Sequence, residues 1–165
     1  WRRQYCGIEM IEMDGVKWYF MDNKFYFGRP YIYGMGGDEG ERFAYFCRAN
    51  WRYKLLEYKR AMGEKTEKAD FDIMMRDYDY VLNHMPDFSF AYYNKANMLC
   101  IQQDFKAAIA YYTQAINTDE DFAEAYFNRG LTYIYIGEND KGIADLSKAG
   151  ELGIYQAYNL ISRFQ

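Results

Sequence analysis

Few side chains in this sequence have the types and spacing that chemistry requires. The run from Gly36 to Gly40 reads Gly-Gly-Asp-Glu-Gly, whose glycines could let a turn approach nucleotide phosphates while the acids hold a metal ion. A helical pattern follows directly, so the run is better explained as a flexible connector whose acids cap the next helix. The single histidine, His84, lies near the end of a predicted helix, and the sequence offers no second histidine for a dyad or a metal site.

Nucleophilic chemistry has no better support. None of the three serines stands in a Gly-x-Ser-x-Gly setting. The cysteines, Cys6, Cys47 and Cys100, are widely spaced and odd in number, which favours reduced thiols over a disulfide framework. We therefore expect the protein not to be an enzyme and to need neither a metal nor a cofactor.

Composition narrows the class of partner. Half of the 165 residues are hydrophobic, which is enough for a substantial core, and the formal charge of -4 is spread along the chain. Nucleic acid calls for a basic stripe, so we expect no such partner. Charges interrupt every apolar run well before the ~20 residues that cross a bilayer, which predicts a soluble protein with no membrane span. No signal peptide is visible, so the cytoplasm is favoured. Export stays open, because the chain starts at Trp1 and not at a methionine, as it would if a leader had been removed.

A strip of similar sequence recurs three times, at residues 44–49, 91–96 and 125–130. A step of about 34 residues takes each residue of the second copy to its counterpart in the third, and a period of this length indicates stacked helix pairs. The same step relates residues of the expected second helix. The matched pairs are Tyr92 with Tyr126, Ala96 with Gly130, Ala108 with Gly142, Tyr112 with Leu146 and Ala115 with Ala149.

This pattern resembles the tetratricopeptide repeat, which has an aromatic residue early in its first helix, a small residue four positions later, and alanine, aromatic and alanine along its second helix. The resemblance covers residues 42 to 154. It implies an all-α fold, an α-α superhelix of three helix pairs plus a C-terminal capping helix, with a short N-terminal β or irregular segment. Gly142 occupies a small position of the last pair and should loosen its helix by roughly 0.5 to 1 kcal/mol relative to alanine.

Two domains are expected. Residues 1–41 form an aromatic and glycine-rich segment, and residues 42–165 form the repeat domain. The repeat domain divides into repeat 1 at 42–88, repeat 2 at 89–122, repeat 3 at 123–154 and the capping helix at 155–164. Tyr45 and Tyr92 are 47 residues apart, so repeat 1 contains about 13 extra residues near 58–69, which either lengthen its first helix or form a solvated loop.

The N-terminal segment has the pattern of a β-meander. Residues 10–13 and 16–21 flank Asp14-Gly15, a strong signal for a two-residue hairpin turn. A second turn at residues 22–23 would lead to a strand at 25–27. The alternative, in which residues 6–13 are the tail of an earlier repeat helix, stays open.

The resemblance also implies a ligand surface. In this family the concave face is built mainly by the first helix of each pair, which offers aromatic walls for apolar side chains and asparagine amides that can bind a peptide backbone. The implied residues are Phe46, Asn50 and Tyr53 from the first pair, Tyr93, Asn94, Asn97 and Ile101 from the second, and Glu124, Phe127, Asn128, Leu131 and Tyr135 from the third.

One subclass of ligand is disfavoured by charge. Family members that hold a C-terminal carboxylate of a chaperone use cations at positions where this sequence has Phe46, Glu124 and Asn128. Each missing charge-assisted hydrogen bond would be worth about 1.5 to 3 kcal/mol. Arg48, Lys95 and Arg129 do recur in register, but we expect their charges to reach solvent, as we do for Asp77.

We therefore predict a scaffold that binds a protein or an extended peptide in its groove, as part of a larger protein or assembly. The alternative is a structural or oligomerisation module, in which the N-terminal segment either fills the chain's own groove or pairs with another copy to form a homo-oligomer.

Overall fold

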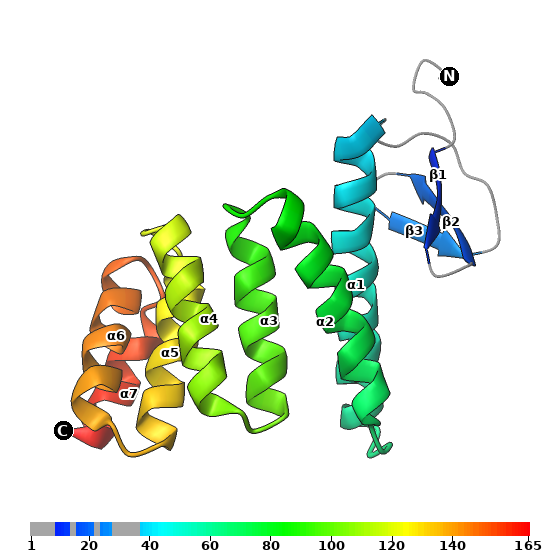
Figure 1. Cartoon of the computed structure of the whole chain (residues 1–165). Helices are drawn as coiled ribbons and strands as arrows, with labels where there is room; N and C mark the ends of the chain where they lie inside the picture. Colours follow the sequence, from blue (N-terminus) through cyan, green and yellow to red (C-terminus); the bar gives the residue numbers. More distant parts are fainter. Residues whose placement is uncertain (1–8, 14–15, 22–23, 28–36) are drawn as a thin grey trace. The chain divides into compact units, whose positions relative to one another are not determined.

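The computed structural model describes residues 9–13, 16–21, 24–27 and 37–165 (Figure 1). The chain forms two compact units, Trp1–Pro86 and Asp87–Gln165, and each is described by itself. Side chains are described from Tyr45 onward, except that of Cys47.

The first unit contains a three-stranded antiparallel sheet. Its strands are β1 (Glu9–Met13), β2 (Val16–Met21) and β3 (Lys24–Phe27), in the order β1-β2-β3. Met13 pairs with Val16 and Met21 with Lys24. Residues 9–13 are thus a strand and not the end of a helix. The two connections, and the rest of the N-terminal segment, lie outside the described residues.

Two helices complete the first unit, α1 (Gly37–Ala61) and α2 (Lys68–His84). The expectation of a connector through residues 36–40 is wrong for Gly37–Gly40, which are the first turn of α1. With 25 residues α1 is nearly twice as long as α3 or α5, which have 13 each, and its residues 55–61 continue beyond the point at which α3 ends in the same register. A longer first helix thus takes up about half of the extra sequence. A capping box of Glu67 and Asp70 starts α2.

The second unit is made of five helices, α3 (Ser89–Ile101), α4 (Phe105–Thr118), α5 (Ala123–Tyr135), α6 (Asn139–Glu151) and α7 (Gln156–Phe164). Each packs against the next along the chain (Figure 1). Three of the connections contain a residue with positive φ, which reverses the chain just after a helix ends. These residues are Gln103, Gly137 and Gly153.

Small and large side chains alternate between the paired helices. Ala96, Ala108 and Ala115 are fully buried and let α3 and α4 come close, while Tyr112 fills the space beside them. Leu146 and Ala149 do the same for α6. The predicted fold is confirmed: a short β segment is followed by helix pairs and then by a terminal helix.

Gly130 and Gly142 mark the closest approach of α5 and α6. A Cβ added at Gly142 would lie 2.8 Å from the backbone oxygen of Gly130 and would overlap Ile134. A Cβ added at Gly130 would lie 3.0 Å from the backbone oxygen of Gly142. Gly142 therefore costs helix propensity but allows a tight contact with Gly130, as expected for small residues at these positions.

Gly142→Ala should lower stability although alanine favours helix. Overlap with backbone cannot be relieved by a side-chain rotation, so we expect a loss of about 1 to 3 kcal/mol, measured by urea unfolding. The matched control is the reverse change on the same helix, Ala144→Gly at an exposed site, which should cost about 0.5 to 1 kcal/mol from propensity alone. A more stable Gly142→Ala protein would contradict the close approach.

Candidate functional site

A cation on the first helix of each pair contacts the second helix. Arg48 is 1% exposed, and its Nε and Nη2 donate to the two carboxylate oxygens of Asp77 at 2.8 and 2.5 Å. Arg129 makes the same two-pronged contact with Asp145, at 2.7 and 2.8 Å. The expectation that these cations and Asp77 reach solvent is wrong, because a facing carboxylate compensates the guanidinium inside the protein.

The second pair uses a different partner at the equivalent place. Lys95 Nζ is 2.9 Å from the hydroxyl of Tyr111 and 4.2 Å from the centre of its ring, and Lys95 is buried. Hydrogen bonding and a cation–π contact thus hold this cation to the second helix of its pair. We call these three contacts, Arg48–Asp77, Lys95–Tyr111 and Arg129–Asp145, the clasps.

The spacing of the clasps repeats along the sequence. The partner follows the cation by 16 residues in the second and third clasps and by 29 in the first. The difference is 13, the size of the extra sequence inferred for repeat 1. This spacing was visible in the sequence and would have identified the acidic partners.

The contact with Asp145 in the third clasp favours the charged form of Arg129. The hydrogen bond to Asp145, helped by its negative charge, raises the pKa of Arg129, and burial opposes this only in part. Arg129 also donates to Thr113 on α4 at 3.0 Å, so it joins three helices of the second unit.

Asp77→Ala should strongly destabilise the protein. The change leaves the Arg48 guanidinium buried without its carboxylate, which typically costs about 3 to 5 kcal/mol. Chemical unfolding followed by circular dichroism would measure the loss. Asp72→Ala is the matched control, because its 4.0 Å contact with Lys68 is solvent-exposed and worth about 0 to 1 kcal/mol. Equal losses in the two variants would contradict a buried clasp.

Asparagine and tyrosine side chains join α3 to α5. Asn128 Nδ2 donates to Tyr93 Oη at 2.9 Å and to Asn97 Oδ1 at 3.0 Å, and the Tyr112 hydroxyl donates to the same Asn97 oxygen. The Tyr93 ring lies 4.8 Å from that of Phe122. We call Tyr93, Asn97, Tyr112 and Asn128 the amide cluster. Its amides hold the helices in register, a role that the sequence prediction did not assign to them.

The first unit contains the same kind of bond. The Tyr78 hydroxyl donates to Asn50 Oδ1 at 2.6 Å, as Tyr112 does to Asn97. Phe46, a predicted groove residue, is buried edge-on against Tyr78 and so is not part of an open surface. Tyr53 is half-buried. These three predicted residues belong to the first unit, and the other nine to the second.

The amide cluster brings together three of the nine predicted residues of the second unit, Tyr93, Asn97 and Asn128, and we call the face of α3 and α5 that carries the nine predicted positions the α3–α5 surface. Around the amide cluster, Glu124 and Leu131 are exposed, and Tyr135 is 72% exposed with its ring 4.6 Å from Phe105. Phe127 is half-buried against the Leu146 core. Asn94 and Ile101 are also half-buried. The result is a rigid polar centre with apolar side chains beside it.

Within the part of the chain that the structure describes, no group of three or more histidine, cysteine, aspartate or glutamate side chains is placed to hold a metal ion. None of the described helices combines the length and the apolar character that a membrane crossing requires.

Family models match both parts of the chain. A TPR repeat model matches residues 96–137, and a tetratricopeptide repeat model matches residues 123–152. The stretch 96–152 thus carries repeats of the tetratricopeptide repeat family. A third model, the starch synthase catalytic domain, matches residues 1–77.

Solved structures share the helical fold. The first TPR of Spaghetti (RPAP3) bound to an HSP90 peptide superposes with a TM-score of 0.63 at 16% identity, over 79% of this chain and 95% of that one. The second TPR domain of human RPAP3, in complex with an HSP70 peptide, gives 0.62 at 18% identity over 78% and 98%. MamA gives 0.56 at 22% identity over 76% and 75%. At these identities the likeness concerns the fold.

The relatives found by sequence are glycogen synthases. The protein of Geobacillus thermodenitrificans is 65% identical over 49 residues, which is 30% of this chain and 10% of that protein. The protein of Desulfitobacterium hafniense is 53% identical over 64 residues, or 39% and 12%. The chain thus spans about a tenth of the length of these relatives.

This match corrects the prediction that the chain is not an enzyme. Residues 1–77 resemble part of a glycosyltransferase catalytic domain, as closely as 65% over the aligned stretch. A short piece of a large catalytic domain need not contain catalytic residues at a recognisable spacing, which is why the sequence offered no such set. The reading of residues 1–41 as a segment that fills the groove stays a prediction.

Proposed function

We propose that the second unit binds an extended peptide, or an extended segment of a protein, on the α3–α5 surface. The observation that carries the proposal is the amide cluster, which holds α3 and α5 together and leaves Leu131 and Tyr135 exposed beside it. A rigid surface loses little conformational entropy on binding, and exposed apolar side chains give the ligand anchors to cover. Structural neighbours of the same fold were solved with HSP90 and HSP70 peptides, which supports a peptide ligand.

The charge of the surface limits the kind of peptide. None of its nine predicted residues is cationic, and Glu124 adds a negative charge. Lys95 is buried in its clasp and Arg129 is held by Asp145. A ligand that depends on a free carboxylate would find no cation among these nine residues to pair with. The proposed ligand is therefore an extended segment with apolar anchors, bound independently of a C-terminal carboxylate.

Peptides selected from a display library against the intact chain would test this proposal. Leu131→Asp and Tyr135→Ala should each weaken the selected peptides about tenfold or more, because they remove apolar contact at exposed sites. Fluorescence anisotropy with synthetic peptides measures the affinity. Amidating the peptide C-terminus should leave it unchanged.

Gln114→Ala is the matched control, since Gln114 is exposed on α4 and is not one of the nine residues. Thermal melts should agree among all variants. Selected peptides that bind the α3–α5 variants as tightly as the wild type would contradict the proposal, and so would peptides that require a free carboxylate.

The match to glycogen synthases supports a second candidate function. We propose that residues 1–77 bind α-glucan, the class of polymer for which those relatives are named. The intact chain should then sediment with glycogen but stay in the supernatant with an α-1,6-linked dextran. Equal sedimentation with both polymers, or with neither, would contradict this candidate and leave the peptide-binding proposal untouched.

A further inference from the structure

An apolar stripe runs along the second half of α1. Trp51, Leu55 and Tyr58 follow one another at spacings of four and three residues, which places them on one face of α1, and Met62 continues the row just after the helix ends at Ala61. They are 50, 39, 61 and 62% exposed. Single exposed apolar residues are ordinary, but a contiguous row of large ones typically marks an interaction surface.

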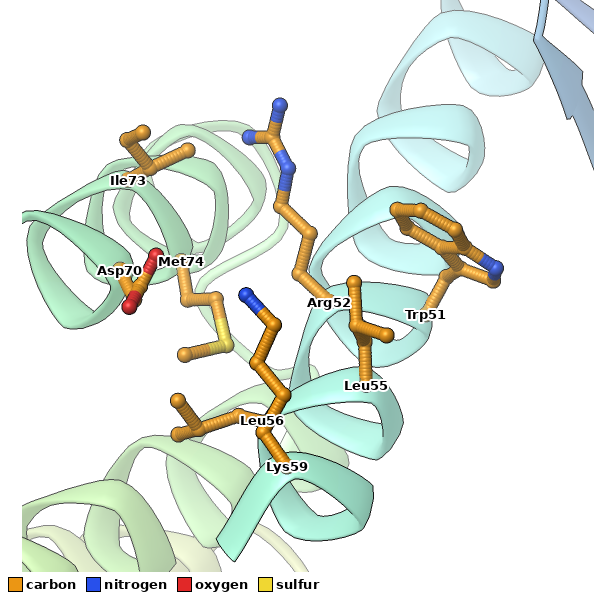
Figure 2. A pocket seen from close by; sticks show the side chains of 8 residues that line it. All are labelled: Trp51, Arg52, Leu55, Leu56, Lys59, Asp70, Ile73 and Met74. Carbon is orange, nitrogen blue, oxygen red and sulfur yellow. The ribbon is translucent and has the colours of Figure 1, made fainter. Parts of the chain in front are cut away.

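A pocket opens between α1 and α2 beside this stripe (Figure 2). Its volume is about 130 Å³, and it includes the buried side chains of Leu56 and Met74. Leu55 and Ile73 also line it, and Trp51 from the stripe lies at its edge in Figure 2. An apolar cavity of roughly 150 Å³ holds a benzene molecule, so this pocket suits one leucine-sized or phenyl-sized side chain.

The charges around the pocket are mainly positive. Arg52 and Lys59 line it together with a single acid, Asp70. Asp70 Oδ2 accepts the backbone N–H of Glu67 at 3.0 Å as part of the capping box of α2, so its charge complements the start of that helix. Arg52 lies 3.5 Å from Asp77, whose carboxylate is already held by Arg48.

The rest of this stretch of α1 has the same sign. Between residues 49 and 61 it carries Arg52, Lys54, Lys59 and Arg60 against Glu57 alone. A basic rim around an apolar floor is complementary to an acidic partner that presents apolar side chains.

We propose that this face of the first unit, the α1 face, binds an acidic amphipathic helix. One apolar side chain of the ligand fills the pocket, its neighbours pack along the stripe, and its carboxylates face Lys59 at the rim. A helical ligand is favoured because the stripe repeats at the spacing with which one helix packs into the groove of another. The α1 face shares no residue with the α3–α5 surface, so the two proposals can fail separately.

A synthetic 15-residue peptide tests the α1 face on the intact chain. The probe has leucines three and four residues apart, glutamate and alanine elsewhere, and blocked ends. Three matched peptides replace the leucines by serine, the glutamates by glutamine, or the glutamates by lysine. Anisotropy of the labelled probe should show saturable binding that weakens about tenfold or more with serine, falls with glutamine and is lost with lysine. Affinity should also fall as salt is raised.

Protein variants distinguish binding in the pocket from attraction to the overall positive charge of this stretch of α1. Ile73→Phe fills the pocket without removing a core contact, and Lys59→Glu reverses a lining charge; each should weaken the probe about tenfold or more. Lys65→Glu makes the same charge change at an exposed position away from the pocket and should have little effect. Leu131→Asp on the α3–α5 surface should have none.

Three results would overturn the proposal. The first is a probe that does not bind, or that binds Ile73→Phe and Lys59→Glu as tightly as the wild type. The second is equal binding of the lysine peptide, which would show apolar adhesion without charge selection. The third is a dimer in sedimentation velocity that Trp51→Asp converts to a monomer, because a second copy of the chain would then cover the stripe.

Discussion

The helix pairs depend on burying a cation between them. A guanidinium or ammonium group inside a protein is costly unless a partner compensates it, and each pair supplies one partner on its second helix. Arg48 and Arg129 have carboxylates in two-pronged geometry, and Lys95 has a tyrosine hydroxyl and ring. Such a contact tolerates little sliding of one helix along the other, so it sets the register in which the alanines and glycines meet.

The surfaces follow from that register. With α3 and α5 each fixed to its own partner helix, Asn128 can reach Tyr93 and Asn97 across the α3–α5 surface. The close approach at Gly130 and Gly142 fixes the last full pair in the same way. Exposed apolar side chains beside these contacts, such as Tyr135 on α5, are the ones that the proposal assigns to a ligand.

The sequence predicted the helix pairs well because their signal is local and periodic. Alanine, tyrosine and alanine along one face specify a packed helix whatever the tertiary contacts are, and the 13 extra residues could be counted from the offset between Tyr45 and Tyr92. The prediction that the charges of Arg48 and Asp77 reach solvent was wrong, because their burial depends on pairing with each other across 29 residues of sequence. The amide cluster was missed for a similar reason, since an asparagine that binds a neighbour reads the same in sequence as one that binds a ligand. The closeness of Ile134 to Gly142 is likewise not revealed by any spacing.

The first helix pair lies outside the residues that the TPR models match. α1 lies within the 77 residues that match the starch synthase catalytic domain, whereas the first TPR match begins at residue 96. Yet α1 contacts α2 through the same kind of clasp as α5 makes with α6. A helix with an arginine directly before a small residue can take this packing role, whatever family it resembles.

A double-mutant cycle on the first clasp tests this account most directly. Arg48→Met, Asp77→Leu and the double variant would be compared by the free energy of unfolding in urea. The account predicts that each single change costs about 3 to 5 kcal/mol and that the double variant costs far less than their sum, because two apolar side chains replace a buried ion pair without leaving a charge. Losses that add to within about 0.5 kcal/mol would show that the two side chains do not depend on each other, and would contradict the clasp as the contact that sets the register.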